Sequence, residues 1–216
     1  TGGTEKFIRE NGFEVHSVSE LTEFPEIMDG SVKTLHPAVH GGLLFRRVDE
    51  RHLLQAAEHN IQPIDLLVLN LYPFDATVAK KGSTEEEIIE NIYIGGPAML
   101  RIASKNYEGV ALLTSSGQYE SFTKSLQENN GGTTLDERLV LARDAFASVA
   151  SYDVAISKYF DGFTQKQNDL RISGPLVTTP PYGENPHQVA SGYVKEIPAN
   201  HSQIWGKKRS YKNNLE

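Results

Sequence analysis

Asp65-Leu66-Leu67-Val68-Leu69-Asn70-Leu71-Tyr72 is an almost unbroken apolar run that lies between Pro63 and Pro73. A short apolar run bounded by turn signals is typical of a strand buried on both faces, as in a parallel sheet. Asn70 and Tyr72 stand at its carboxyl end, where open α/β sheets bind their ligands. The run therefore predicts a parallel sheet and the edge of that sheet at which a site is expected.

Strands and helices are predicted to alternate on both sides of this run. Thr84 with Glu87, and Thr134 with Glu137, have the spacing of capping boxes, which mark helix starts. Alternation of this kind indicates one α/β domain with a mostly parallel sheet over about residues 1–165. The expected strands are 13–18 and 109–114, and the expected helices are 5–11 (capped by Thr4), 49–60, 84–91, 98–106, 118–128 and 134–160.

The end of the chain is organised differently. Residues 166–180 are rich in polar and helix-breaking residues and are predicted to be a linker. Strand-like pieces follow at about 188–197 and 201–205. Residues 181–216 are too few to bury a core of their own, so they are expected to be part of something larger.

Composition excludes several classes of function. The chain has 216 residues, of which 38% are hydrophobic and 23% charged, so a packed core is feasible. A net charge of -7 argues against a nucleic-acid partner, which requires a basic surface. No apolar run approaches the roughly 20 residues of a membrane span. The absence of cysteine excludes disulfides, thiolate metal sites and cysteine nucleophiles, and is compatible with a cytosolic enzyme.

A second informative stretch is Ser31-Val32-Lys33-Thr34-Leu35-His36-Pro37-Ala38-Val39-His40-Gly41-Gly42. Its proline and its glycine pair predict an irregular segment, and the crowding of polar side chains favours either a site or an ordinary surface loop. His36 and His40 are four residues apart, as paired zinc ligands on a helix are. Because Pro37 lies between them and no glutamate stands in the required place, we expect no metal site but hydrogen-bonded or core histidines.

Two glycine-containing turns could hold an anion. Thr1-Gly2-Gly3-Thr4 precedes a predicted helix, so it combines backbone N–H groups, hydroxyls and the positive end of a helix dipole. Gly95-Gly96-Pro97 also exposes amides at a helix start, with proline in the first turn. Taken alone, a plain tight turn is the better explanation of either pattern.

Two lysines and a tyrosine are candidates for chemistry. Lys33, among glycines and hydroxyls, could hold a phosphate or stabilise an oxyanion. Lys105 could be an acid or base if burial lowers its pKa, although most lysines are solvated surface residues. Tyr72 could donate a hydrogen bond to an oxyanion or simply end a strand. These residues indicate a small anionic, phosphorylated ligand at the strand ends, but no particular reaction.

Seven groups of residues, taken in order, resemble one family. This is the bifunctional purine biosynthesis family, which joins an IMP cyclohydrolase domain to an AICAR formyltransferase domain. Each group is modest, but the ordered set is specific and covers nearly the whole chain. The groups are 1–4, 19–26, 32–37 with 40–42, 70–74, 94–97 with Lys105-Asn106, Tyr152-Asp153 with Ala155-Ile156, and 182–188.

The resemblance implies a fold and an organisation. Residues 1–165 are expected to form a methylglyoxal-synthase-like three-layer α/β domain with a mostly parallel sheet, lacking its first strand and helix. The linker 166–180 would lead into the beginning of a second α/β domain, the transformylase, at 181–216. The chain would then be an internal fragment, with the catalytic pair of the second domain beyond Glu216.

The resemblance also implies an activity and partners. The cyclohydrolase closes formyl-AICAR to IMP with loss of water, and no cofactor is implied at its site. The transformylase half would formylate AICAR with 10-formyltetrahydrofolate as co-substrate. Expected partners are small nucleotides (formyl-AICAR, IMP and AICAR), with neither nucleic acid nor membrane, and the full-length protein is expected to be a cytosolic homodimer.

Site residues are carried over by position. Lys33 and Tyr72 would line the reacting end, Lys105 would be the proton donor and acceptor, and Tyr93 occupies a catalytic position. Tyr182 would contact AICAR in the second domain, and no metal ligand is implied. The implied nucleotide-binding residues are Thr1, Gly2, Gly3, Thr4, Ser31, Val32, Lys33, Thr34, Asn70, Ile94 and Gly95.

Three departures from the family pattern keep alternatives open. Ser31 and Pro181 stand where the family usually has arginine, and Tyr93 stands where it usually has aspartate. A phenol cannot accept a proton near neutral pH as a carboxylate does. One alternative is therefore a degenerate, non-catalytic nucleotide-binding copy of the same fold. Another is a methylglyoxal-synthase-like lyase, which does not explain residues 182–188.

Overall fold

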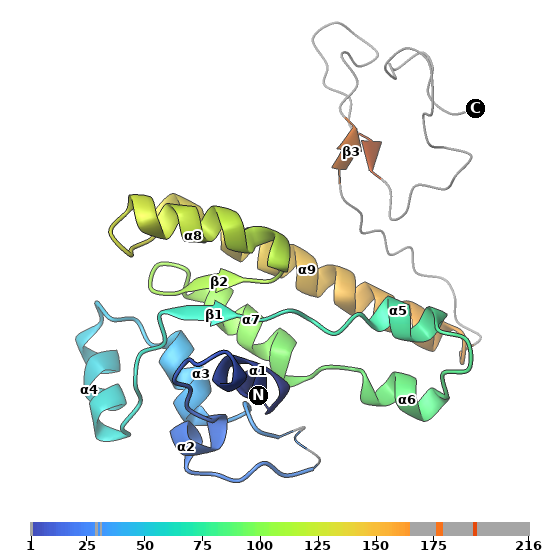
Figure 1. The fold of residues 1–216 in the computed structure, drawn as a ribbon, viewed down its shortest axis with the longest axis horizontal. Helices are drawn as coiled ribbons and strands as arrows, with labels where there is room; N and C mark the ends of the chain where they lie inside the picture. Colours follow the sequence, from blue (N-terminus) through green and yellow to red (C-terminus); the bar gives the residue numbers. More distant parts are fainter. Residues whose placement is uncertain (1, 29, 31, 165–175, 179–191, 194–216) are drawn as a thin grey trace, which may run out of the picture. The chain divides into compact units, whose positions relative to one another are not determined.

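The sheet predicted around residues 65–72 is present. In the computed structural model, which describes residues 2–28, 30, 32–164, 176–178 and 192–193, β1 (Leu66–Val68) pairs in parallel with β2 (Ala111–Leu113) (Figure 1). The register sets Leu67 opposite Leu112. Bonds from the Ala111 N–H to the Asp65 carbonyl and from the Leu69 N–H to the Leu113 carbonyl extend the pairing at both ends. The prediction of a parallel sheet is confirmed.

The predicted burial of this strand on both faces is wrong. Leu66 and Val68 are 40% and 48% exposed, whereas every residue of β2 is buried. Within the described residues β2 is the only strand beside β1, so part of β1 has no neighbour to cover it. The apolar run predicted the strand correctly, but burial depends on neighbours that a strand's own sequence does not contain.

The predicted helices are confirmed, and three further α-helices of the described residues, α2, α3 and α5, were not among them. Acidic side chains and a reciprocal capping box at Thr84 and Glu87 start α6 as predicted. The second box is half formed, because the Glu137 carboxylate accepts from Ser125 while the Glu137 N–H donates to Thr134. The helices are α1 (Gly2–Glu10), α2 (Val18–Thr22), α3 (Pro37–Leu44), α4 (Glu50–Glu58), α5 (Phe74–Ala79), α6 (Glu85–Glu90), α7 (Gly95–Lys105), the 3-10 helix η1 (Ser116–Gln118), α8 (Tyr119–Glu128) and α9 (Leu135–Asp161).

Helix α7 runs through the core of the first unit. Its apolar residues recur on one face, where Leu100 and Ala103 are completely buried. The helix packs against α3, which buries Leu43, and against β2, which buries Leu112. In Figure 1, α3 and α7 lie below the strands and α8 above them. Fully burying a leucine side chain stabilises the fold by roughly 1.5–3 kcal/mol, so these contacts hold α7 firmly.

Asn106, just beyond α7, ties this helix to the end of α3. The buried Asn106 side chain donates to the carbonyls of Leu43 and Phe45, at 2.9 and 3.2 Å. These carbonyls belong to the last turn and cap of α3, whose carbonyl groups have no partner within the helix. The bonds therefore fix α3 relative to α7, and so position the residues that precede α3.

Two predictions near the start of the chain are wrong. Residues 13–17 are not a strand, because Ser17 caps α2 by accepting from the Glu20 N–H at 3.1 Å, and no described strand lies beside them. Thr4 is not a helix cap, since α1 already begins at Gly2. The predicted stop after α1 is confirmed, because Gly12 has a φ of +83°.

The histidine-containing stretch is only partly irregular, which corrects the prediction. Residues 32–36 are outside regular helix, but α3 begins at Pro37 and continues through Gly41 and Gly42. Proline is well suited to the first turn of a helix, and the His36 Nδ1 accepts from the Ala38 N–H as a cap. A Cβ on Gly42 would lie 2.6 Å from the Gln62 carbonyl oxygen, so this glycine permits close packing.

The chain divides into two units, Thr1–Tyr152 and Asp153–Glu216, and each is described by itself. In the second unit β3 (Leu176–Thr178) pairs antiparallel with β4 (Gly192–Tyr193). The β4 strand falls in a piece predicted to be strand-like, and β3 falls in the range predicted to be a linker. Most of 166–216, including Pro181 and Tyr182, lies outside the described residues, so the predicted domain boundaries stay a prediction. Among the described helices, none is long and apolar enough to cross a membrane.

Candidate active site

Two segments that are sixty residues apart meet at the start of α7. Thr34 is buried, and its Oγ1 lies so close to Gly95 that a Cβ there would be only 2.5 Å away. Gly95 is in the first turn of the helix, where backbone N–H groups have no partner within the helix. The contact therefore brings the candidate segments 32–34 and 94–95 to one place.

A tight turn positions Lys33 beside this contact. An isolated bridge pairs Ile27 with Val32, and Gly30 has the positive φ of +82° that the turn requires. The Lys33 ammonium lies 3.5 Å from a Glu26 carboxylate oxygen, and the side chain is 22% exposed. Glu26 thus holds the ammonium in place, and an incoming phosphate or oxyanion would compete with it. Ser31 lies outside the described residues.

Tyr72 and Tyr93 form a stacked pair next to the same helix start. Their ring centroids are 4.7 Å apart and their planes differ by 26°. The Tyr93 N–H donates to the Tyr152 hydroxyl at 2.9 Å, and that hydroxyl donates to the Asn91 carbonyl at 3.1 Å. A Cβ on Gly96 would lie 2.3 Å from the Tyr93 ring. Sequence reasoning missed this packing, although the glycine pair was a signal for it.

Burial is the main cause that raises the pKa of the Tyr93 phenol above its ordinary value, and Tyr72 and Tyr152 raise it further. The phenol is therefore protonated at neutral pH and cannot accept a proton there. This agrees with the sequence argument that a tyrosine at position 93 does not replace a carboxylate.

Other nucleotide-binding candidates are placed less closely. Asn70 follows β1 and donates to the Tyr119 hydroxyl at 3.1 Å, and Ile94 is exposed just before α7. Gly2, Gly3 and Thr4 form the first turn of α1, and within the described residues no hydrogen bond joins them to Lys33 or Thr34. Thr1 lies outside the described residues.

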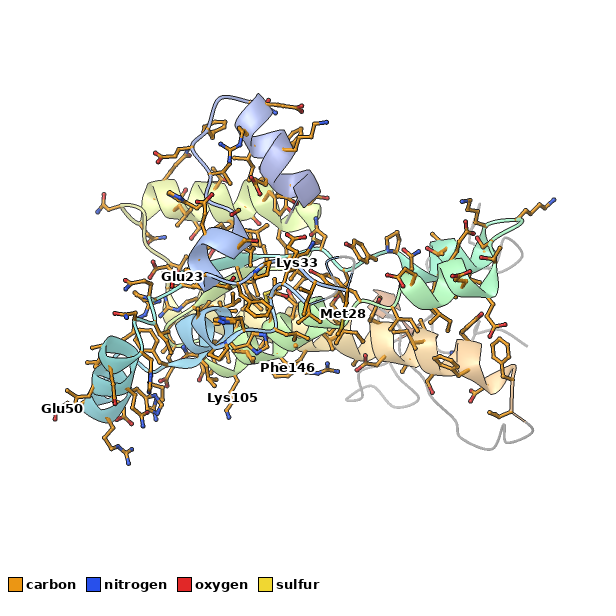
Figure 2. All side chains as sticks on the ribbon, turned by 90° about the horizontal axis from the view of Figure 1, so that it is seen from below. Glu23, Met28, Lys33, Glu50, Lys105 and Phe146 are labelled. Carbon is orange, nitrogen blue, oxygen red and sulfur yellow. The ribbon has the colours of Figure 1, made fainter. Side chains whose placement is uncertain are left out.

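Lys105 lies at the other end of α7. Ten residues separate it from Gly95, which is about 15 Å along a helix. The lysine is exposed, and Figure 2 shows it near Phe146 and apart from Lys33. It borders a groove of about 540 Å³ that is also lined by Arg101, Ser104, Tyr107, Leu139, Ala142, Arg143 and Phe146. Within one chain, the structure does not bring Lys105 to Lys33 and Tyr72.

A larger cleft of about 600 Å³ lies elsewhere, at the amino ends of β1 and β2. Its arginines have structural partners: Arg47 pairs with Asp65, and Arg138 donates to the carbonyls of Tyr107, Glu108 and Thr133. Ligands of open α/β sheets bind at the carboxyl ends of strands instead. We therefore place the candidate site at the start of α7.

Of the two histidines, His36 is hydrogen-bonded, as predicted. Among the described residues, no group of three histidine, cysteine, aspartate or glutamate residues could hold a metal ion. His36 caps α3, whereas the His40 Nε2 is buried without a hydrogen-bond partner. Burial lowers the pKa of His40 below its ordinary value of 6.5.

This shift predicts a pH dependence of stability. The unfolded chain binds a proton at His40 near pH 6.5, and the folded chain binds it only at lower pH. The contribution of a neutral His40 is therefore complete above pH 6.5 and is lost as the pH falls through the lowered pKa. If urea midpoints are measured between about pH 5 and 8, the midpoint should decrease towards the acid end of this range. The decrease should be smaller in His40→Gln. Equal pH slopes in the two proteins would contradict this assignment.

Comparison with known proteins shows the family of the chain. The profile described as AICARFT/IMPCHase bienzyme matches residues 103–216, which is more than half of the chain. The chain belongs to the AICARFT/IMPCHase bienzyme family. A second profile, the MGS-like domain, matches residues 1–98 of this AICARFT/IMPCHase chain. The resemblance and the fold class inferred from the sequence are confirmed.

Individual relatives agree. The AICARFT/IMPCHase chain is 47% identical to the bifunctional purine biosynthesis protein PurH of Cereibacter sphaeroides (strain ATCC 17025 / ATH 2.4.3) and 44% identical to that of Bacillus subtilis (strain 168). These alignments cover 99% of this chain but 41% and 43% of the relatives, so the chain spans about two fifths of their length. A solved structure, "Crystal structure of ForH", matches with a TM-score of 0.66 and 33% identity, over 76% of this chain and 84% of that one.

Proposed function

We propose that this chain carries the IMP cyclohydrolase part of a bifunctional purine biosynthesis enzyme. The carboxamide nitrogen of formyl-AICAR attacks the formyl carbon, a C–N bond forms, and the carbonyl electron pair moves to the formyl oxygen. The carboxamide nitrogen then loses one proton and the formamide nitrogen another, and the formyl oxygen takes up two protons. As the C–O bond breaks and the oxygen leaves as water, a C=N bond forms between the former formyl carbon and the formamide nitrogen, which gives IMP. The reaction needs a folded-back substrate, stabilisation of the oxyanion and proton transfer.

The observation that carries the proposal is the contact of Thr34 with Gly95. It joins Val32, Lys33 and Thr34 to Ile94 and Gly95, five of the residues that the family pattern assigns to the nucleotide. The unpaired N–H groups at the start of α7 are suited to bind nucleotide oxygens. Thr1–Thr4, Ser31 and Asn70 complete the proposed nucleotide-binding set.

Lys33 and Tyr72 are proposed to act at the reacting end. The Lys33 ammonium can stabilise negative charge on the formyl oxygen once that oxygen displaces Glu26. Tyr72 is half exposed beside Tyr93, so its hydroxyl is free to donate to the same oxygen. Neither role requires a metal or a redox cofactor.

Lys105 is proposed to transfer the proton from a second copy of the chain. It is exposed and about 15 Å along α7 from the glycines, too far to serve the site of its own chain. Apolar and basic side chains around it, including Leu139 and Phe146, form a surface that a second copy could cover. A homodimer would thus build each site from Lys33 and Tyr72 of one copy and Lys105 of the other.

The remaining proposals concern the whole protein. Its second activity would formylate AICAR with 10-formyltetrahydrofolate as co-substrate, with Tyr182 in the AICAR site. The substrates are small nucleotides in both activities, and a cytosolic location suits an enzyme of nucleotide synthesis. The family match supports these proposals, but the chain spans only part of the relatives.

IMP formation from formyl-AICAR, followed by absorbance, tests the cyclohydrolase. The chain is assayed alone and as a chimera in which it replaces the matching segment of the Bacillus subtilis relative. Turnover is expected in the chimera, with a loss of about 10²-fold or more in Lys33→Ala. Lys124→Ala, an exposed lysine on α8, is the matched control and should retain full activity. IMP binding by calorimetry without turnover would favour the non-catalytic alternative that Tyr93 and Ser31 suggest.

A further inference from the structure

To donate a hydrogen bond in a defined direction, the hydroxyl of Tyr72 has to be held in one orientation. Tyr72 lies between β1 and α5, outside regular structure, and is 52% exposed. Among the described residues no hydrogen bond holds its hydroxyl, and its one ring contact is with Tyr93. A phenol on an irregular segment would otherwise be free to rotate, which weakens a directed hydrogen bond.

Tyr93, in contrast, is held from several sides. Its N–H is bound by the hydroxyl of Tyr152, a buried residue on α9. Its ring lies directly against Gly96 in the first turn of α7, where no side chain intervenes. Tyr152 is in turn bonded to the Asn91 carbonyl and makes an edge contact with Phe74. The ring of Tyr93 is therefore a rigid surface attached to α7.

We propose that Tyr93 is a positioning residue for Tyr72: its ring, which is seated on Gly96 and whose backbone N–H is held by Tyr152, sets the direction in which the Tyr72 hydroxyl points. This inference rests on the proposed function, which gives Tyr72 its role. Tyr93 then acts through the packing of its ring and not as a proton acceptor. Offset stacking at the observed centroid distance of 4.7 Å is a favourable geometry for such a pair. The raised pKa of the Tyr93 phenol is consistent with a group that transfers no proton.

Kinetics of the chimera test the proposal. Tyr72→Phe should lower kcat by about 10²-fold, the loss of one oxyanion donor. Tyr93→Leu should lower kcat roughly tenfold or more with KM nearly unchanged, because the donor is misplaced. The double variant should be no slower than Tyr72→Phe, since Tyr93 acts only through Tyr72. Tyr93→Phe keeps the ring and should recover most of the rate lost in Tyr93→Leu. Phe13→Leu, an exposed aromatic outside the site, is the control.

Gly96→Ala provides a second route to the same displacement. Its Cβ would meet the Tyr93 ring at 2.3 Å, so the ring must move. The variant should lower kcat as Tyr93→Leu does, and combining the two should add little. Additive losses in either double variant would overturn the proposal. So would a rise in kcat in Tyr93→Asp, which would show that the position serves the reaction through a carboxylate.

A structural measurement separates this proposal from the proposed function. Proton NMR of ring-labelled tyrosine in the chain reports the Tyr72 ring through the ring current of Tyr93. The Tyr72 signals should move towards those of free tyrosine in Tyr93→Leu and stay in Tyr93→Phe. If the unmodified chimera has no turnover, the proposed function fails, and this measurement still decides whether Tyr93 positions Tyr72. Unchanged Tyr72 signals in Tyr93→Leu would refute the positioning role.

Discussion

A mixture of Lys33→Ala and Lys105→Ala chimeras is expected to recover about a quarter of the unmodified activity, although each variant alone loses about 10²-fold or more. Random pairing makes half of the dimers mixed. In a mixed dimer one site lacks both lysines, while the other combines Lys33 of one chain with Lys105 of its partner and is intact. Half of the dimers with half of their sites active give the expected quarter.

The physical reason is the length of α7. The helix separates Lys105 from Gly95 by about 15 Å, and buried contacts of Leu100 and Ala103 prevent it from bending towards Lys33. The control is a single chain that carries both substitutions, mixed with itself, which should stay inactive. A mixture with no recovery, under conditions where subunits are shown to exchange, would place both lysines in one chain and contradict the shared site.

Leu100→Ala is expected to lower the free energy of unfolding by about 3 kcal/mol. Leu100 is completely buried in the middle of α7, among residues of α3, β2 and α9. Removing its side chain forfeits the burial of the lost methylene and methyl groups and leaves a cavity. Urea unfolding of the chain should show a lower midpoint with an unchanged slope.

Leu54→Ala is the matched control for this prediction. Leu54 is on α4 and is 71% exposed, so the same chemical change removes little buried surface. Its effect should stay within about 0.5 kcal/mol, as for most surface substitutions. A similar loss in the two variants would mean that α7 is not the centre of the core.

Local signals in the sequence predicted local structure well. Pro97 after Gly95-Gly96 marked the start of α7, and Thr84 with Glu87 marked α6, because caps and first turns depend on adjacent residues. The strand expected at 13–18 did not form, because an alternating pattern becomes a strand only where a neighbour supplies the other half of its hydrogen bonds.

In the candidate site, too, some features could be predicted from the sequence and others depend on contacts between distant segments. The positions of Lys33, Thr34 and Gly95 in one place could be inferred from the family pattern, and the structure gives the contact between the last two. The Tyr72–Tyr93 stack could not be inferred, because it depends on how an irregular segment lies in space. The separation of Lys105 from Gly95 follows from the length of the predicted helix, although the family pattern alone assigned both to one site. The roles assigned to these residues stay predictions until they are measured.

The glycine pair at the start of α7 links four positions into two separate evolutionary pairs. Gly95 leaves room for Thr34 and Gly96 leaves room for Tyr93, so each glycine is matched to a different side chain from elsewhere in the chain. With a smaller residue at position 93, position 96 would no longer have to be glycine. Position 95 would still have to be glycine, because Thr34 lies against it. Within this lineage, positions 93 and 96 should therefore vary together, independently of the pair formed by 34 and 95.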